Sequence, residues 1–269
     1  MIVGIDLGAS ALKIVGIERN RVLFTHAESG RKTEVGVTLG NVLSQNGYRS
    51  ADVETVALTG VGAEKCVVGK GYSNVVTVSE IEATGEGGTY LAGIDSAVIV
   101  SLGTGTAIVL AKDGEYTHIG GSGVGSGTVR GLAKRMMGIT DLPEYFSLAE
   151  KGDRSKVDLQ IRDLFSGMDT LPLDLTASNF AKSSEEAADE DWAAAIINMA
   201  LEVAGSHAAL ACSGFGVDTV VITGGLSQTA AAAKCYAGFD RLYPQHFIIP
   251  KYSAFATAIG AVRRAEFGA

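Results

Sequence analysis

The chain has few prolines and few cysteines, and the cysteines exclude two kinds of structural site. Its 269 residues include four prolines and three cysteines, Cys66, Cys212 and Cys235. Because these cysteines are widely spaced and form no Cys-x-x-Cys pair, they indicate neither a zinc cage nor a disulfide framework. We interpret them as reduced, small apolar residues of a protein that works inside the cell.

Clustered positive charge is also missing. Only 19% of the residues are charged, and the formal net charge is −8. A protein that follows a phosphate backbone needs grouped Lys and Arg side chains, and no such block occurs. Arg263 and Arg264 stand side by side, but they fit the end of a helix. We therefore expect no nucleic-acid partner.

Long apolar runs are absent as well. No run reaches the ~18 residues that a membrane span requires. The longest candidate, 193–211, is interrupted by Asn198, Glu202 and His207, which favours a buried helix. The first residues carry no basic segment typical of a secretory signal. We expect a cytoplasmic protein without a membrane partner.

What the chain has in excess is glycine, with 35 residues, many of them where strands are predicted to end. Glycine clusters at strand ends indicate binding loops built from backbone. In the first part, β-branched runs and turn residues predict strands at 2–6, 13–17, 22–26, 55–59 and 75–78, and helices at 33–45 and 81–91.

A second cycle of strands and helices begins near Asp95. The predicted strands are 97–102, 107–112, 219–223 and 246–250, and the predicted helices are 127–137, 192–212 and 254–269. Short helices are expected at 141–191, where Ser183 and Glu186 have the spacing of a capping box. We predict an N-terminal domain at 1–93, completed by the helix 254–269, and a C-terminal domain at 94–253 with a helical insertion at about 141–191.

Two similar strand–turn–strand units support this duplication. Residues 3–10 and 99–105 both place Leu-Gly and small residues between two strands. Two such units facing one another would clamp a polyphosphate from both sides.

Asp6 ends the first strand and is followed by the turn Leu7-Gly8-Ala9-Ser10. A carboxylate there could hold Mg²⁺, while the N–H groups of Gly8 and Ser10 meet phosphate oxygens. Lys13 on the next strand could add a positive charge. An ordinary hairpin turn with a capping Asp remains the alternative.

Three further glycine segments could contact a nucleotide. The first is the turn Gly103-Thr104-Gly105-Thr106, which a plain hairpin would explain as well. The second is Gly120 to Gly127, with Gly121, Gly123, Gly125 and Gly127, where free N–H groups before a helix would face an anion; a flexible linker is the alternative. The third is Gly224-Gly225 after a strand, a place for adenosine or simply a tight turn.

Glu80 lies where a strand ends and a helix begins. Its carboxylate could accept a proton from a substrate hydroxyl that attacks the γ-phosphoryl group of ATP. Alternatively, Ser79 caps the helix, and Glu80 and Glu82 only stabilise its positive end.

Taken in order, these motifs resemble the type II pantothenate kinases across essentially the whole chain. The matching segments are Gly4-Ile5-Asp6-x-Gly8-x-Ser10-x-x-Lys13, Leu58-Thr59-Gly60, Glu80-Ile81-Glu82-Ala83, 102–106, 120–127, Gly152-Asp153-Arg154, Val157-Asp158-Leu159, 175–180 and Ala258-Ile259-Gly260-Ala261. The segment 152–180 separates this family from related sugar kinases.

The resemblance implies an α/β fold: a duplicated ribonuclease-H-like, actin-like ATPase fold with an ATP cleft between two domains. It implies phosphorylation of pantothenate by ATP and Mg²⁺ to give 4′-phosphopantothenate, which begins coenzyme A synthesis. Glu80 matches the family's catalytic carboxylate, and Asp6 matches a residue at the Mg²⁺ and phosphate end. Thr104 is expected to contact the substrate together with Glu80, and a homodimer is implied.

One residue departs from the family. An Arg that grips the pantothenate carboxylate usually stands two residues before the third loop, and this chain has His118 there. A largely neutral imidazole offers at most one hydrogen bond to a carboxylate, whereas a guanidinium offers two charge-assisted ones. Either another cation, such as Lys65 or Arg130, replaces the Arg, or the acceptor is another small alcohol.

Two non-kinase functions also use such phosphate loops. One is an ATP-hydrolysing activator of a radical dehydratase, which shares an iron–sulfur cluster at a dimer seam and so needs thiolates that this cysteine spacing does not indicate. The other is a nucleotide sensor without catalysis, which would have no use for Glu80.

Overall fold

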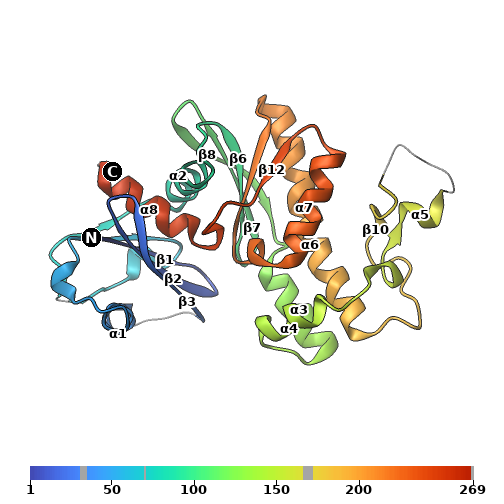
Figure 1. The fold of residues 1–269 in the computed structure, drawn as a ribbon, viewed down its shortest axis with the longest axis horizontal. Helices are drawn as coiled ribbons and strands as arrows, with labels where there is room; N and C mark the ends of the chain where they lie inside the picture. Colours follow the sequence, from blue (N-terminus) through green and yellow to red (C-terminus); the bar gives the residue numbers. More distant parts are fainter. Residues whose placement is uncertain (31–34, 70, 166–171, 268–269) are drawn as a thin grey trace.

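Two five-stranded sheets with the same strand pattern form the framework of the computed structural model, which describes residues 1–30, 35–69, 71–165 and 172–267 (Figure 1). The first sheet has the order β3-β2-β1-β4-β5, with β1 Ile2–Leu7, β2 Ala11–Glu18, β3 Arg21–Ser29, β4 Thr55–Thr59 and β5 Val75–Thr77. The second has the order β12-β11-β6-β7-β8, with β6 Ala97–Leu102, β7 Thr106–Lys112, β8 Glu115–Ser122, β11 Thr219–Gly224 and β12 His246–Ile248.

Each sheet consists of an antiparallel meander of three strands followed by two parallel strands. β4 runs parallel to β1 and β5 to β4, just as β11 runs parallel to β6 and β12 to β11. The duplication predicted from the sequence is therefore confirmed, and it extends beyond the short loop motifs to the whole of both sheets.

The helices are α1 Val35–Gln45, α2 Glu80–Ala92, α3 Ser126–Met137, α4 Leu142–Ala149, α5 Ile161–Leu164, α6 Asp189–Phe215, α7 Ala230–Leu242 and α8 Ala256–Phe267. Short 3-10 turns lie at η1 Ser50–Asp52, η2 Ala63–Lys65, η3 Arg154–Lys156, η4 Gly225–Gln228 and η5 Ser253–Phe255. Parts of three predicted elements, 33–34, 166–171 and 268–269, lie outside the described residues.

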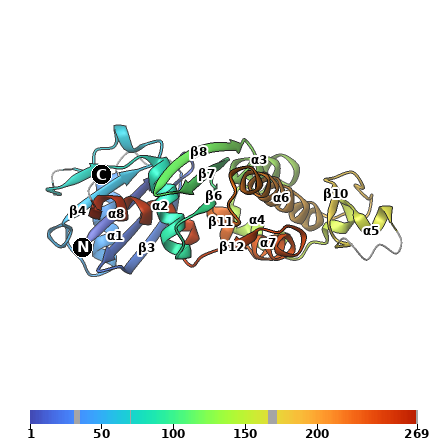
Figure 2. The same cartoon turned by 90° about the horizontal axis from the view of Figure 1, so that it is seen from above.

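Helices α2 and α8 cross between the two sheets (Figure 2). The chain exchanges them: α2 follows the first sheet but packs on the second, and α8 follows the second sheet but packs on the first. Glycines make the crossing close, since a methyl group added at Gly87 would lie 1.9 Å from the Ala256 carbonyl oxygen. One added at Gly260 would lie 1.9 Å from the Ala83 carbonyl oxygen. The domain boundary at 93/94 stays a prediction.

The outer faces of the sheets carry the other large helices. α1 buries Val35, Leu39 and Leu43 against the first sheet, and α6 joins the core of the second. Among the described residues, α6 is also the one helix long and apolar enough to cross a membrane. However, 61% of its apolar window is buried inside the protein, as is usual for the core helix of a soluble protein.

The insertion differs from the predicted short helices. Beside α4, η3 and α5 it contains a two-stranded sheet, β9 Leu159–Gln160 and β10 Thr176–Ser178. We call residues 159–165 and 172–178 the arm, which projects at the end of the molecule far from the first sheet (Figure 1). The predicted capping box is wrong: α6 begins at Asp189, and the Ser183 hydroxyl donates to the Phe180 carbonyl instead.

Candidate active site

Asp6 lies at the end of β1, where its carboxylate is buried beside Lys13 of β2. The Lys13 Nζ is 3.7 Å from Asp6 Oδ2, and the two residues are register partners. Burial raises the pKa of Asp6, and the positive charge of Lys13 only partly opposes this. A buried carboxylate with one cation at 3.7 Å is a group that a second cation would stabilise.

Gly60, which the sequence indicated only through the family pattern, also belongs to this site. It follows β4 with φ +89°, and an added methyl group would lie 2.7 Å from Asp6 Oδ1. Only glycine allows both this backbone conformation and this approach. The signal in the sequence is Thr-Gly directly after a buried strand.

Glu80 is the first residue of α2 and lies near the same carboxylate. The Ser79 side chain makes no capping hydrogen bond, so the alternative in which Ser79 caps the helix is not supported. The outer side of Glu80 is exposed, but surrounding protein removes enough water to raise the pKa of its carboxyl. The negative charge of Asp6 raises the pKa of Glu80 further, and Lys13 lowers it.

The two turns predicted to clamp a polyphosphate meet directly. Ser10 Oγ, in the turn that contains Gly8, lies 2.7 Å from Thr104 Oγ1, although the residues are 94 positions apart. Thr104 belongs to the turn between β6 and β7, with Gly103 and Gly105 on either side. The structure therefore brings together Asp6, Lys13, Ser10 and Thr104, with Glu80 close enough to feel the charges of the first two.

The third glycine segment is less open than predicted. Gly120 and Gly121 belong to β8, and Thr106 belongs to β7, so neither lies in a free loop. The N–H groups of Ser126 and Gly127, at the beginning of α3, donate to the carbonyl oxygens of Gly103 and Thr104 at 2.9 Å. The sequence predicted free N–H groups at this helix start, and for Ser126 and Gly127 that prediction is wrong.

Close packing of the two loops gives a second reason for these glycines. A methyl group at Gly121 would lie 2.3 Å from the Thr106 carbonyl oxygen, and one at Gly125 would lie 2.7 Å from the Thr104 carbonyl oxygen. At Gly127 it would lie 2.8 Å from the Thr104 side chain, whereas Gly123 has open space around it. That Gly123 and its neighbours bind phosphate stays a prediction.

Gly224 and Gly225 lie at the same edge of the second sheet. Gly224 ends β11 with φ +90°, and an added methyl group would lie 2.5 Å from the Leu102 carbonyl oxygen. Gly225 begins η4 and has open space around its α-carbon. Gly224 is thus required by the turn itself, while Gly225 leaves room for a ligand.

His118 is an exposed residue of β8, two residues after Tyr116. The Tyr116 hydroxyl donates to Glu86 Oε2 of α2 at 2.8 Å, and its ring packs where a side chain at Gly85 would clash. Tyr116 thus fixes the strand that carries His118 against the helix that carries Glu80.

The comparisons with known proteins decide the family. The profile of the Fumble family matches residues 96–262. The chain belongs to the Fumble family. A protein of Bacillus anthracis named type II pantothenate kinase is 30% identical over 192 residues, and one of Staphylococcus epidermidis is 30% identical over 186 residues. The predicted family resemblance is confirmed.

The match to the Bacillus anthracis protein covers 68% of this Fumble-family chain and 66% of the relative, so it spans just under two thirds of that relative's length. Solved structures show the same fold. The activator of the 2-hydroxyisocaproyl-CoA dehydratase from Clostridium difficile, with bound ADPNP, has a TM-score of 0.67 at 17% identity and covers 99% of this chain and 97% of its own.

A ROK family glucokinase from Streptomyces griseus, in complex with glucose and AMPPNP, has a TM-score of 0.59 at 14% identity and covers 99% of both chains. At such identities the similarity concerns the fold alone. It confirms the predicted α/β actin-like ATPase fold of this Fumble-family protein.

Proposed function

We propose that the protein is a cytoplasmic ATP-dependent kinase that phosphorylates a hydroxyl group of pantothenate to give 4′-phosphopantothenate, the first step of coenzyme A synthesis. The observation that carries the proposal is Glu80, a carboxylate whose pKa is raised by burial and by the charge of Asp6, in a protein whose Ser10 and Thr104 turns meet. Membership of the Fumble family supports pantothenate as the acceptor.

In this proposal Glu80 accepts the proton of the attacking hydroxyl. A general base works best when its pKa is near the operating pH, and burial together with Asp6 shifts Glu80 in that direction. Lys13 and the turns around Ser10 and Thr104 position and neutralise the phosphate chain. Phosphoryl transfer needs little more from a protein than positioning and charge stabilisation.

Asp6 fits the proposed Mg²⁺. Its buried carboxylate has a raised pKa and only one cation near it, so a divalent ion would relieve its desolvation. Among the described residues no three His, Cys, Asp or Glu side chains form a ready-made metal site. Mg²⁺ is usually held by one or two carboxylates together with substrate phosphates and water, which matches a single Asp6. When bound, the ion would neutralise charge on the phosphate oxygens.

His118 motivates a second candidate, a kinase of the same fold that acts on another small alcohol. The alternative cations Lys65 and Arg130 are both exposed, in η2 and α3. Loss of a charge-assisted pair to the pantothenate carboxylate would cost about 1.5–3 kcal/mol, or about tenfold to hundredfold in affinity.

The dehydratase-activator alternative gains no support from the cysteines. Cys212 is fully buried, and burial raises its pKa to about 11; burial also raises the pKa of Cys235. Cluster ligation requires thiolates, which a raised pKa disfavours. The similarity to the Clostridium difficile activator therefore stays one of fold.

We also propose that the protein forms a homodimer through the arm. Leu164, Phe165 and Leu173 are each about half exposed there, at 51%, 46% and 46%. Apolar side chains gathered at one projecting segment suit a protein contact. Light scattering on Leu173→Asp would give a monomer, and an unchanged mass would exclude the arm as the contact.

The decisive experiment measures ADP release from Mg-ATP with and without pantothenate, on wild type, Glu80→Gln and His118→Arg. Pantothenate-dependent release that Glu80→Gln abolishes supports the proposal. If pantothenate stimulates only His118→Arg, the natural acceptor is a different alcohol. Full turnover in Glu80→Gln would exclude Glu80 as the base.

A further inference from the structure

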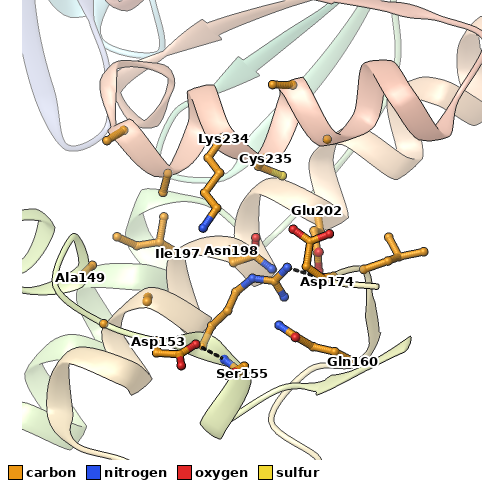
Figure 3. Close-up of a pocket in the computed structure, with 18 of the residues that line it drawn as sticks. Ala149, Asp153, Ser155, Gln160, Asp174, Ile197, Asn198, Glu202, Lys234 and Cys235 are labelled. Atoms are coloured by element: carbon orange, nitrogen blue, oxygen red, sulfur yellow. Dashed lines mark hydrogen bonds between the residues drawn. The ribbon is translucent and has the colours of Figure 1, made fainter. Parts of the chain in front are cut away.

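A large cavity lies apart from the candidate active site, between α4, η3, α6, α7 and the arm. Its volume is about 810 Å³, within the usual size of ligand pockets (Figure 3). None of the site residues described above lines it. Its walls include apolar side chains such as Ile197, Phe239 and Leu242.

Gln160, in β9, is a buried polar residue of this cavity without a complete set of partners. Its side chain is only 2% exposed, and its Oε1 accepts no hydrogen bond from the described residues. A buried amide oxygen that accepts no hydrogen bond costs stability. The oxygen itself has almost no accessible surface, so a ligand would reach it after the amide turns toward the cavity.

Two charged groups of the cavity are unmatched as well. Lys234, an exposed residue of α7, points into the cavity opposite Gln160 and makes no hydrogen bond or ion pair with any of the described residues (Figure 3). Glu202 of α6 accepts from Thr176 at 2.8 Å and from Asn179 at 3.4 Å, but no described cation lies within ion-pair distance of it. The cavity thus presents an unpaired cation on one wall and hydrogen-bond acceptors on another.

Arg154 shows that these groups are held in place. Its guanidinium donates to Thr176 Oγ1 at 2.7 Å, to Asp158 Oδ2 at 3.3 Å and to the Asp174 carbonyl oxygen. Thr176 in turn donates to Glu202, so Arg154 is already bonded and fixes the acceptor wall. A ligand would therefore meet a preformed surface, which reduces the entropy lost on binding.

We infer that this cavity is a second small-molecule site, separate from the Glu80 site, which binds an organic anion that carries hydroxyl or N–H donors at its other end. The anionic group would pair with Lys234. The donors would satisfy Gln160 Oε1 and the Glu202 carboxylate, and the apolar walls would cover the body between them. Nucleotides and pantothenate-like amides both have this chemistry, and the inference does not depend on the proposed phosphoryl transfer.

The test is calorimetric titration of the full chain with ADP and, separately, with pantothenate. For the probe that enters the cavity, Lys234→Ala raises its Kd about tenfold to hundredfold, and Gln160→Leu raises it about fivefold. Lys151→Ala and Gln245→Leu are matched controls outside the cavity, and both leave this Kd unchanged. Asp6→Ala, in the other site, also leaves it unchanged.

Two outcomes overturn the inference. The first is that neither probe shows binding that depends on Lys234 and Gln160. The second is a single binding event weakened equally by Asp6→Ala and Lys234→Ala, because the two places would then hold the two ends of one ligand. Gln160→Leu also reports on folding: with an unpaired amide removed, its ligand-free melting temperature should be no lower than that of wild type.

Discussion

The crossing of α2 and α8 makes a sharp prediction for Gly260→Ala. The added methyl group would lie 1.9 Å from the Ala83 carbonyl oxygen and 2.6 Å from the Gly87 nitrogen. Ordinary contact begins near 3.4 Å, so the helices must separate by about 1.5 Å. Both obstructing atoms are backbone, and no side chain can turn aside to make room.

The expected loss can be bounded from two opposing effects. Overpacking costs typically 1–3 kcal/mol, and a backbone obstruction belongs at the upper end, about 3 kcal/mol. Replacing a helical glycine by alanine recovers about 1 kcal/mol. The net destabilisation of about 2 kcal/mol should lower the melting temperature by about 4–8 °C for a chain of this size. Because α2 begins with Glu80, turnover should fall as well.

Gly131→Ala is the matched control, since Gly131 is an exposed residue of α3 with open space around its α-carbon. It should gain stability, by about 0.5–1 kcal/mol, from helix propensity alone. Thermal and urea unfolding of the two variants measure the difference. If Gly260→Ala is as stable as Gly131→Ala, α2 and α8 are not in close contact at Gly260.

Three further predictions concern single residues. The pH profile of kcat/KM should fall on acidification with a midpoint above 4.5, the ordinary value for Glu, because burial and Asp6 raise the pKa of Glu80 and the base must be ionised. His118→Arg should lower the KM for pantothenate about tenfold to hundredfold in steady-state assays. Arg154→Met should cost about 3–5 kcal/mol in urea unfolding at pH 7, because Asp158 is fully buried and would lose its cation. This loss should shrink as the pH falls through the raised pKa of Asp158, since a protonated carboxyl needs no cation.

Features carried by local pattern were predictable from the sequence. The runs 2–6 and 97–102 consist largely of β-branched and other apolar residues, and both are strands whose bounds differ by at most one residue from those predicted. Asp6 and Glu80 were found because each stands where a predicted element ends or begins. Their proximity followed only from the family resemblance, because no local pattern tells which strand end faces which helix.

Features that depend on contacts between distant segments were missed. The N–H groups of Ser126 and Gly127 are used by the turn at 103–104, and nothing near residue 126 signals that partner. The strands of the arm have two and three residues, too few to show a period. Ser183 has the spacing of a cap but φ +38°, and its hydroxyl turns back to Phe180.

The exchange of α2 and α8 has a consequence for synthesis of the chain on the ribosome. The first sheet receives α1 on one face early, but its other face packs against α8, where Gly4 lies so close that a methyl group would be 2.1 Å from the Ala258 carbonyl oxygen. About 200 residues separate β4 from α8, so at about 5–20 residues per second that face stays uncovered for about 10–40 s. The half that emerges first is therefore among the last to be completed, and until then it offers an open apolar surface to chaperones.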